Sequence, residues 1–424
     1  MPLRTRRALL VTCVAVIVAV LVSAAPASAH AELVSSTPSD AAILTAEPAR
    51  ITLTFSEEID LRLSAVKIVG PDGRRLDTGA LTAGPTGEDS LTTAVALDTH
   101  QGTFSILWQV TASDDGHTTS GHLTFSVGAP SKPATTTALS RNQLTSALSD
   151  AAQWTGFVAL ALIGGFTTLR TQQDDPHDPP TWPVTLGWGA LLIATVLQLL
   201  VYGPAARGLS PSHLFDRSLL AATLATRDGH ALMARLALLA VAAVLGDAVI
   251  RRARSPLIPL VFTVAVAATW GTVGHAATGG GTLLAMASLT LHVTAMALWV
   301  GGLAAVVLLL LTGSGATVGA TAARFSRMAV VAVAVIAATG CYQAWREIGG
   351  ISALIDTTYG RLLLAKVVLL LAVLGLATRS RGLVTRWREG NEAALRGSVL
   401  IELAGAAALL VLAVLLSGNA PPRS

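Results

Sequence analysis

Candidate metal ligands lie at two places in the first third of the sequence. The segment ASDDGHTTSGH contains Asp115 and His117, whose side chains point to the same side of an extended chain because they are two residues apart. His30 directly follows Ala27-Ser28-Ala29, a small-residue pattern typical of a signal-peptidase site. Cleavage after Ala29 would make His30 the N-terminal residue, which would then offer both a free amine and an imidazole.

Brought together, the amine, two imidazoles and a carboxylate form a nitrogen-rich ligand set that suits Cu(II) in a tetragonal site. The alternative is a solvent-exposed turn, because Asp-Gly is common in turns. His122 begins the strand that follows and is a candidate for a group that supports the ligands. His100, in the segment DTHQGT, indicates another exposed turn.

A second group of candidates lies in apolar sequence. His230, His275 and His292 occur in or beside predicted membrane helices, where ionisable groups are costly and usually face a cavity or the bundle interior. Met296 follows His292 by four residues, so it lies one turn deeper on the same helix face. The alternative is ordinary packing, with each histidine hydrogen-bonded to a neighbouring helix.

Other polar residues also interrupt the apolar runs. Arg235, Lys366 and Glu402 lie inside predicted helices. Because Arg235 and Glu402 carry opposite charges, we expect a structural ion pair between them rather than a proton-coupling pair. Cys341 is either a small core residue or a further ligand, and the Gly301-Gly302 pair predicts close helix packing.

The composition of the chain is that of a membrane protein. Its 424 residues are 52% hydrophobic and 13% charged, and the mean hydropathy is +0.62, which argues against a soluble enzyme. Residues 30–130 hold five Lys/Arg and thirteen Asp/Glu, whereas the rest of the mature chain holds 21 and 12. The high pI therefore belongs to the membrane part, and it indicates basic membrane flanks rather than nucleic-acid binding.

The first part of the mature chain, residues 30–130, has the pattern of an all-β domain. The segments RITLTF, GTFSILWQV and HLTFSV alternate apolar and polar residues between Gly, Pro and Asp turns. They predict an exported antiparallel domain, either an immunoglobulin-like or cupredoxin-like sandwich or a barrel, with Phe55, Phe104, Trp108 and Phe125 in its core. Only Cys341 remains after the signal peptide is removed, so no intrachain disulfide is possible and the core alone must hold the domain together.

The remaining chain predicts an all-α membrane bundle. A signal peptide occupies residues 1–29, and the membrane domain occupies 148–424. A linker occupies 131–147, and the Pro/Thr-rich segment APSKPATTT (residues 129–137) overlaps its start. Eight apolar runs are each near the ~20 residues needed to cross a bilayer: 148–169, 183–203, 229–250, 256–277, 282–311, 326–346, 361–378 and 397–417.

The orientation of this bundle follows from two independent signals. Export of the N-terminal domain makes the first helix run inward and the eighth run outward. Arginines are concentrated in the loops that this order places inside, as the positive-inside rule requires. The sequence therefore predicts a multi-pass protein of the cytoplasmic membrane with its N-terminal domain on the extracytoplasmic side.

Several segments resemble known copper proteins. HAELVSSTPSD, ITLTFSEEID and SDDGHTTSGHLTFSV resemble the CopC-like copper-binding domain. The later segments GHAA, LHVTAMALWVGGL, TTYGRLLLAK and VLIELAGAAALL resemble the CopD copper-transport family. Together they cover most of the mature chain in the order of a CopC–CopD fusion.

The resemblance implies that His30, Asp115 and His117 bind Cu(II). It also implies that no Cu(I) site of the methionine-rich kind exists in the first domain, because no Met lies between His30 and Pro130. In the membrane, His275 near the outer face and His292 above Met296 would suit copper moving inward as Cu(I). The expected partners are copper ions and the lipid bilayer, with a copper chaperone or cuproenzyme as a further possibility.

Three functions compete at this point. The leading one is copper homeostasis without enzymatic activity: the exported domain binds Cu(II) and the helices move copper, without a Walker A loop for ATP. The alternative is transmembrane electron transfer through haem or copper, in the manner of a cupric reductase, although His275 and His292 lie at different depths. The third is an oxidative copper enzyme, which the expected Asp115 ligand and the absence of Tyr in the first domain disfavour.

Overall fold

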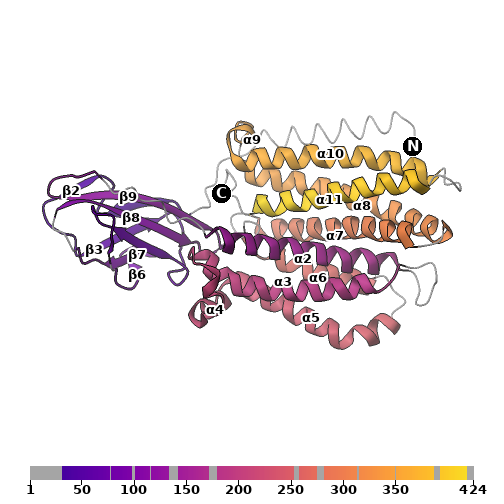
Figure 1. Ribbon diagram of the computed structural model, residues 1–424, viewed down its shortest axis with the longest axis horizontal. Coiled ribbons are helices and arrows are strands. Elements are labelled where there is room, and N and C mark those ends of the chain that lie inside the picture. Colours follow the sequence, from indigo (N-terminus) through magenta and orange to yellow (C-terminus); the bar gives the residue numbers. More distant parts are fainter. Residues whose placement is uncertain are drawn as a thin grey trace.

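The computed structural model describes residues 31–76, 78–97, 101–114, 116–132, 142–170, 179–252, 257–274, 281–312, 315–348, 350–385 and 392–417. The predicted signal peptide, His30, His100, Asp115, His275 and most of the predicted linker lie outside these ranges. Figure 1 shows two parts, a β-sandwich and a bundle of long helices, with the sandwich placed at one end of the bundle.

The N-terminal part is the predicted sandwich. One sheet has the strand order β1-β3-β7-β6, and the other has the order β2-β9-β8-β4-β5. All pairs are antiparallel except β2 with β9. The strands are β1 (Leu33–Thr37), β2 (Ala42–Leu44), β3 (Arg50–Phe55), β4 (Ala65–Val69), β5 (Arg75–Leu76), β6 (Thr82–Gly84), β7 (Gly87–Ala94), β8 (Gly102–Thr111) and β9 (Thr118–Val127).

The predicted aromatic residues form the centre of the sandwich core. Phe55 and Trp108 meet edge to face with ring centroids 5.2 Å apart, and Phe104 stacks on Phe125 at 5.3 Å. All four side chains are buried among apolar residues of the two sheets. Because this core contains no residue of the helices, the sandwich has the means to fold by itself.

In the described part of the chain, eight long α-helices follow the sandwich at the positions of the eight predicted apolar runs, together with two short α-helices. Six of the long helices are long and apolar enough to cross a membrane, namely α2, α3, α7, α8, α10 and α11, counted over the described residues. The long helices are α2 (Gln143–Leu169), α3 (Trp182–Ala206), α5 (Arg227–Arg252), α6 (Leu257–Gly271), α7 (Thr282–Thr312), α8 (Gly315–Ile348), α10 (Thr358–Thr385) and α11 (Glu392–Ser417); the short ones are α4 (Arg217–Leu224) and α9 (Ala353–Asp356).

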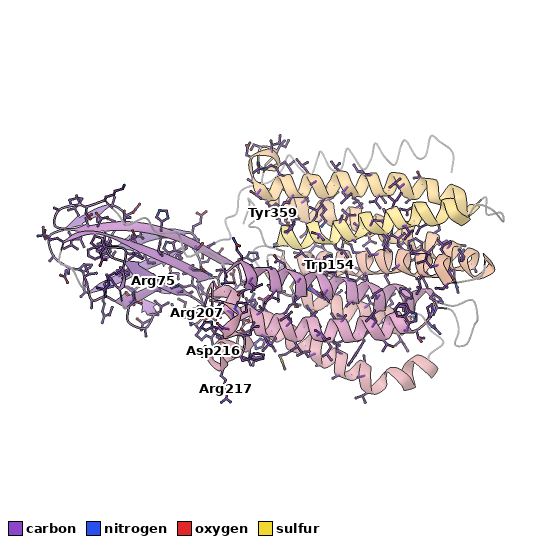
Figure 2. All side chains as sticks on the ribbon, in the orientation of Figure 1. Arg75, Trp154, Arg207, Asp216, Arg217 and Tyr359 are labelled. Carbon is purple, nitrogen blue, oxygen red and sulfur yellow. The ribbon has the colours of Figure 1, made fainter. Side chains whose placement is uncertain are left out.

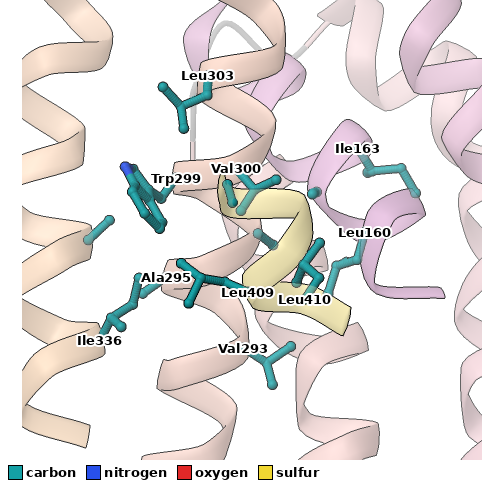
Figure 3. Packing of buried hydrophobic residues seen from close by; sticks show 14 of the residues in the cluster. Leu160, Ile163, Val293, Ala295, Trp299, Val300, Leu303, Ile336, Leu409 and Leu410 are labelled. Atoms are coloured by element: carbon teal, nitrogen blue, oxygen red, sulfur yellow. The ribbon is translucent and has the colours of Figure 1, made fainter. Parts of the chain in front are cut away.

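Helix α7 lies at the centre of the bundle. Its residues Val300 and Leu303 pack among apolar side chains from α2 and α11, including Leu160, Ile163 and Leu410 (Figure 3). Glycines at the contact allow the backbones of α7 and α2 to lie against each other. A Cβ added to Gly301 would overlap the carbonyl oxygen of Ala161, and a Cβ added to Gly165 would overlap the backbone of Gly301. The close packing predicted for the Gly301-Gly302 pair is therefore confirmed.

We expect Gly301→Ala to destabilise the bundle by about 1–3 kcal/mol, because the added methyl group forces α2 and α7 apart. Gly189→Ala in α3 is the matched control, since no atom lies within 4 Å of its added Cβ. Both variants gain the same helix propensity, so the difference between them reports the packing alone. The measurement is thermal unfolding of the purified protein in detergent, and equal melting temperatures would contradict the close contact.

The sandwich contacts the bundle through α3, α4 and α5. Leu63 packs against Ala206 and Ala222, and the Gln109 side-chain amide donates a hydrogen bond to the Ala206 carbonyl oxygen. The Arg227 guanidinium donates to the carbonyl oxygen of Asp114 at 3.3 Å. We call this end of the bundle the sandwich end and the opposite end the far end.

Candidate metal site and internal cavity

A cavity of about 410 Å³ extends from the sandwich into the bundle. Among the described residues, the sandwich contributes Gly116, His117 and Thr118, and the rest of the lining comes from eight helices and from the two residues Val273 and Gly274 after α6. The polar side chains around it are His117, Thr118, Ser146, Ser149, Asp150, Gln153, Tyr202, Asp228, His292, Gln343, Arg346, Glu347, Tyr359 and Lys366. The cavity is therefore lined by a predicted metal ligand of the sandwich, His117, and by a predicted metal ligand of the membrane helices, His292.

His117 is held at the end of the longest hairpin of the sandwich. Strands β8 and β9 pair in register from Gly102 with Val127 to Thr111 with Thr118, and the DDGH turn (residues 114–117) connects them. The His117 carbonyl oxygen accepts a hydrogen bond from the Ala112 amide at 2.9 Å. This hairpin places the half-buried His117 side chain on the cavity.

The first described residue lies beside this same turn. Ala31 is 1% exposed, and its carbonyl oxygen accepts a hydrogen bond from the Thr119 hydroxyl at 3.0 Å. Thr119 lies two residues after His117 on β9, and the Glu32 amide is in turn held by Ser56 at 3.0 Å. The residue that follows His30 in the sequence is thus attached to the strand that begins directly after His117.

His122 is placed differently from His117. It lies five residues further along β9, where the residues of odd number, such as Leu123 and Phe125, face the core. His122 is exposed and pairs with Leu107 of β8. Its side chain is therefore on the outer surface of the sheet.

His292 lies on α7 at the deep part of the cavity and is 7% exposed. Its Nδ1 lies 2.9 Å from the hydroxyl oxygen of Thr339 on α8. The Thr339 hydroxyl donates its own proton to the Val335 carbonyl oxygen at 2.6 Å, so it accepts a hydrogen bond from the Nδ1–H of His292. The Nε2 atom then carries a free lone pair, and no hydrogen-bond partner for it is found among the described residues.

This arrangement is the one that metal-binding histidines commonly show. One ring nitrogen donates to a neighbouring group, which fixes the tautomer and the orientation of the ring, and the other ring nitrogen is left for the metal. Met296 lines the same cavity one helical turn further along α7 and is half-buried. An imidazole nitrogen and a thioether sulfur thus face one space in the bundle.

The opposite wall of the cavity is polar and comes from α8 and α10. Tyr359 lies at the start of α10 (Figure 2), and its hydroxyl donates a hydrogen bond to the Glu347 carboxylate. Lys366 lines the cavity two turns further along α10. Sequence reasoning singled out Lys366 but missed Glu347 and Tyr359. The available signal was the position of Glu347, an acidic residue at the end of the apolar run of α8.

The other predicted path residues have different surroundings. His230 is exposed on α5 and does not line the cavity, and Cys341 is half-buried on α8 outside the cavity lining. His275 lies outside the described residues. Within the described part of the chain, no group of three or more His, Cys, Asp or Glu residues is arranged to hold a metal ion.

The ion pair expected between Arg235 and Glu402 is not formed. The Arg235 guanidinium donates to Thr269 at 2.9 Å and to Gln198 at 3.1 Å, and it lies 3.5 Å from the centroid of the Trp270 ring. Amide and hydroxyl oxygens together with the face of an indole ring satisfy this buried cation without a carboxylate. Arg235 therefore fixes α5 to α3 and α6.

A second cavity, of about 220 Å³, lies between α7, α8, α10 and α11. Trp299, Leu303, Phe325 and Glu402 are among the residues around it. Trp299 is 3% exposed and lies one residue before Val300, which lines the first cavity. The two cavities thus follow each other along α7.

Comparison with known proteins identifies both parts of the chain. Residues 33–128 match the CopC domain family, and residues 319–416 match the family described as copper resistance protein D. His292 and Met296 precede this second matched stretch.

Two relatives show how far the similarity extends. Copper transport protein CutJ of Bacillus subtilis (strain 168) is 28% identical over 417 residues, which cover 93% of this chain and 75% of CutJ. Protein YobA of Escherichia coli (strain K12) is 38% identical over 99 residues, which cover 23% of this chain and 79% of YobA.

The sandwich also resembles solved structures. CopC from Methylosinus trichosporium OB3b has 23% sequence identity and a TM-score of 0.22, and the match covers 24% of this chain and 97% of that one. PcoC, a copper resistance protein from Escherichia coli, has 26% identity and a TM-score of 0.21, and the match covers 23% of this chain and 99% of PcoC.

Proposed function

The chain belongs to the proteins that join a CopC domain to a copper resistance protein D domain, and from this premise we propose that its sandwich binds Cu(II) and that its helices carry copper inward across the cytoplasmic membrane. Copper is the cargo of this path. CutJ is described as a copper transport protein and PcoC as a copper resistance protein, and these descriptions support the assignment of copper.

The observation that carries the proposal is the Nε2 atom of His292. This nitrogen is buried and has no hydrogen-bond partner among the described residues, and His292 lines a cavity that His117 of the sandwich also lines. A histidine in ordinary packing would have both ring nitrogens satisfied, because an unmade hydrogen bond at a buried polar atom costs about 1–3 kcal/mol. A passing metal ion gives this nitrogen its missing partner.

The ligands proposed for Cu(II) on the sandwich are His30, Asp115 and His117. The attachment of Ala31 to Thr119 supports this set, because it brings the chain that leads to His30 beside the strand that begins after His117. Two imidazoles, an amine and a carboxylate favour Cu(II) over softer ions. His122 is not included, since its side chain is exposed on the outer surface of the sheet.

The ligand types along α7 support the inward direction of the path. His292 comes first from the sandwich end and Met296 follows one turn deeper, so a borderline ligand precedes a soft one that favours Cu(I). Beyond Trp299 the second cavity continues the path toward the far end. We propose that the far end is cytoplasmic, because the predicted signal peptide exports the sandwich and the far-end loops are rich in arginine.

Copper uptake tests this function directly. Cells that produce the protein are expected to accumulate radioactive copper faster than cells without it, at equal external copper and equal expression of other genes. The matched measurement is loss of copper from cells loaded beforehand, which should be unchanged. Faster loss without faster uptake would assign the opposite direction, and no difference in either measurement would remove copper transport as the function.

A further inference from the structure

We propose that Asp228 and Tyr202 form a handover site at the mouth of the cavity, where the helices take Cu(II) directly from the docked sandwich. The inference rests on the proposed function of the cavity. The site takes a Cu(II) ion with nitrogen and oxygen ligands: the His117 imidazole from the sandwich and the Asp228 carboxylate from α5.

The first observation is how closely the DDGH turn meets these two side chains. Gly116 has a φ of 73°, and a Cβ at this position would lie 2.5 Å from the Tyr202 hydroxyl and 2.7 Å from Asp228 Oδ2. Only glycine fits between the turn and the helices. The carboxylate of Asp228 is therefore against the backbone of the residue that directly precedes His117.

The second observation is that hydrogen bonds hold both the Asp228 carboxylate and the DDGH turn that it faces. The Tyr202 hydroxyl donates a hydrogen bond to Asp228 Oδ2 at 3.3 Å, which orients the carboxylate at the start of α5. Arg227, the preceding residue, holds the carbonyl oxygen of Asp114 at the other side of the turn. Adjacent residues of α5 thus hold the turn and face it with a carboxylate.

The third observation is where the cavity goes from this point. His117, Tyr202 and Asp228 line the cavity where the sandwich meets the helices, and Asp150, Gln153 and His292 line the same cavity inside the bundle. His292 is only 7% exposed, and its Nε2 atom has no hydrogen-bond partner among the described residues. A ligand delivered at the mouth therefore has an open nitrogen further along the same space.

These three observations define the chemistry of the step. Copper exchanges the carboxylate oxygen of Asp115 for that of Asp228 while the His117 nitrogen stays bound. The oxidation state and the summed charge of the ligands therefore do not change. Carboxylate and imidazole both suit Cu(II). Because the sandwich is already docked, the transfer needs no dissociation of a carrier.

The test compares the initial rate of copper transport by full-length variants in proteoliposomes, with the Cu(II) affinity of the sandwich measured on the same preparations. We expect Asp228→Asn to lower the rate about tenfold or more, the size typical for loss of a group that orders a metal site, and to leave Cu(II) affinity unchanged. Asp356→Asn removes an exposed carboxylate on α9 that does not line the cavity, and it should transport like wild type.

Two further comparisons separate transfer from folding. Asp228→Glu keeps the carboxylate and should retain most of the rate, whereas equal losses in the Asn and Glu variants would give Asp228 a structural role and overturn the proposal. Gly116→Ala should slow transport because its Cβ overlaps Tyr202 and Asp228. Gly87→Ala is its control, since Gly87 also has a positive φ but no atom within 4 Å of its Cβ.

The outcomes also distinguish this inference from the proposed function. If wild type transports copper and Asp228→Asn transports equally well, the handover site is wrong and the cavity path stands. If wild type itself moves no copper, the proposed function fails, and the handover site falls with it.

Discussion

The His292→Ala variant is expected to lose copper movement while the sandwich still binds Cu(II) as in wild type. The substitution removes the buried Nε2 atom of His292, so copper would lose the nitrogen ligand that α7 is proposed to supply inside the bundle. The proposed Cu(II) site should be unaffected because it lies in the sandwich, whose core contains no residue of the helices. Copper accumulation in proteoliposomes, at matched protein levels, measures the effect.

His213→Ala is the control for this result. It removes an imidazole near the sandwich end, where His213 is exposed and its Nδ1 lies within hydrogen-bond distance of the Ser210 and Ser212 hydroxyls. This variant should transport like wild type. Equal transport by His292→Ala would return His292 to ordinary packing and leave the route through the bundle unidentified.

The Met296→Leu variant tests the next proposed ligand, which lies one helical turn further along α7, in the same transport measurement. Leucine keeps the volume of methionine but lacks its sulfur, so the bundle should remain as stable while transport slows. A rate equal to that of wild type would show that the Met296 sulfur does not contact copper. A fall in thermal stability together with the rate would instead indicate a packing role.

The sandwich could be predicted because its pattern is local. Alternation with period two places Phe55, Phe104 and Phe125 in the core, and the structure confirms this. The parallel pairing of β2 with β9 was not predictable, because β2 has only three residues and no pattern that specifies its partner. The positions of the long helices followed from apolar runs, whereas the short helices α4 and α9 are too brief to give such a signal.

The candidate site was predictable only where its residues share one helix. His292 and Met296 are four residues apart, so their common face follows from helix geometry. Glu347 and Tyr359 reach the same cavity from α8 and α10, and a single sequence does not specify how those helices pack. The expected pair of Arg235 and Glu402 was wrong for the same reason: opposite charge does not determine proximity, and Arg235 found its partners on α3 and α6.

The other large effect concerns the free amine of His30. One alanine added before His30 in the isolated sandwich, residues 30–130, is expected to weaken Cu(II) binding strongly. The added residue moves the terminal amine out of the chelate but leaves every strand unchanged, because β1 begins at Leu33 and Ala31 is fixed by Thr119. Cu(II) titration and the EPR spectrum measure the change, since the loss of one nitrogen ligand alters both affinity and spectrum.

Side-chain variants complete this ligand test. Asp115→Ala and His117→Ala should each weaken Cu(II) strongly, whereas His122→Ala should bind as wild type because its side chain is on the outer surface of the sheet. Zn(II) should compete poorly, since a tetragonal set of ligands does not match its tetrahedral preference. An unchanged affinity and spectrum in the alanine-extended sandwich would exclude the terminal amine. A His122→Ala variant more damaged than His117→Ala would place the Cu(II) site on the outer surface of β9, away from the cavity and from the path that leads to His292.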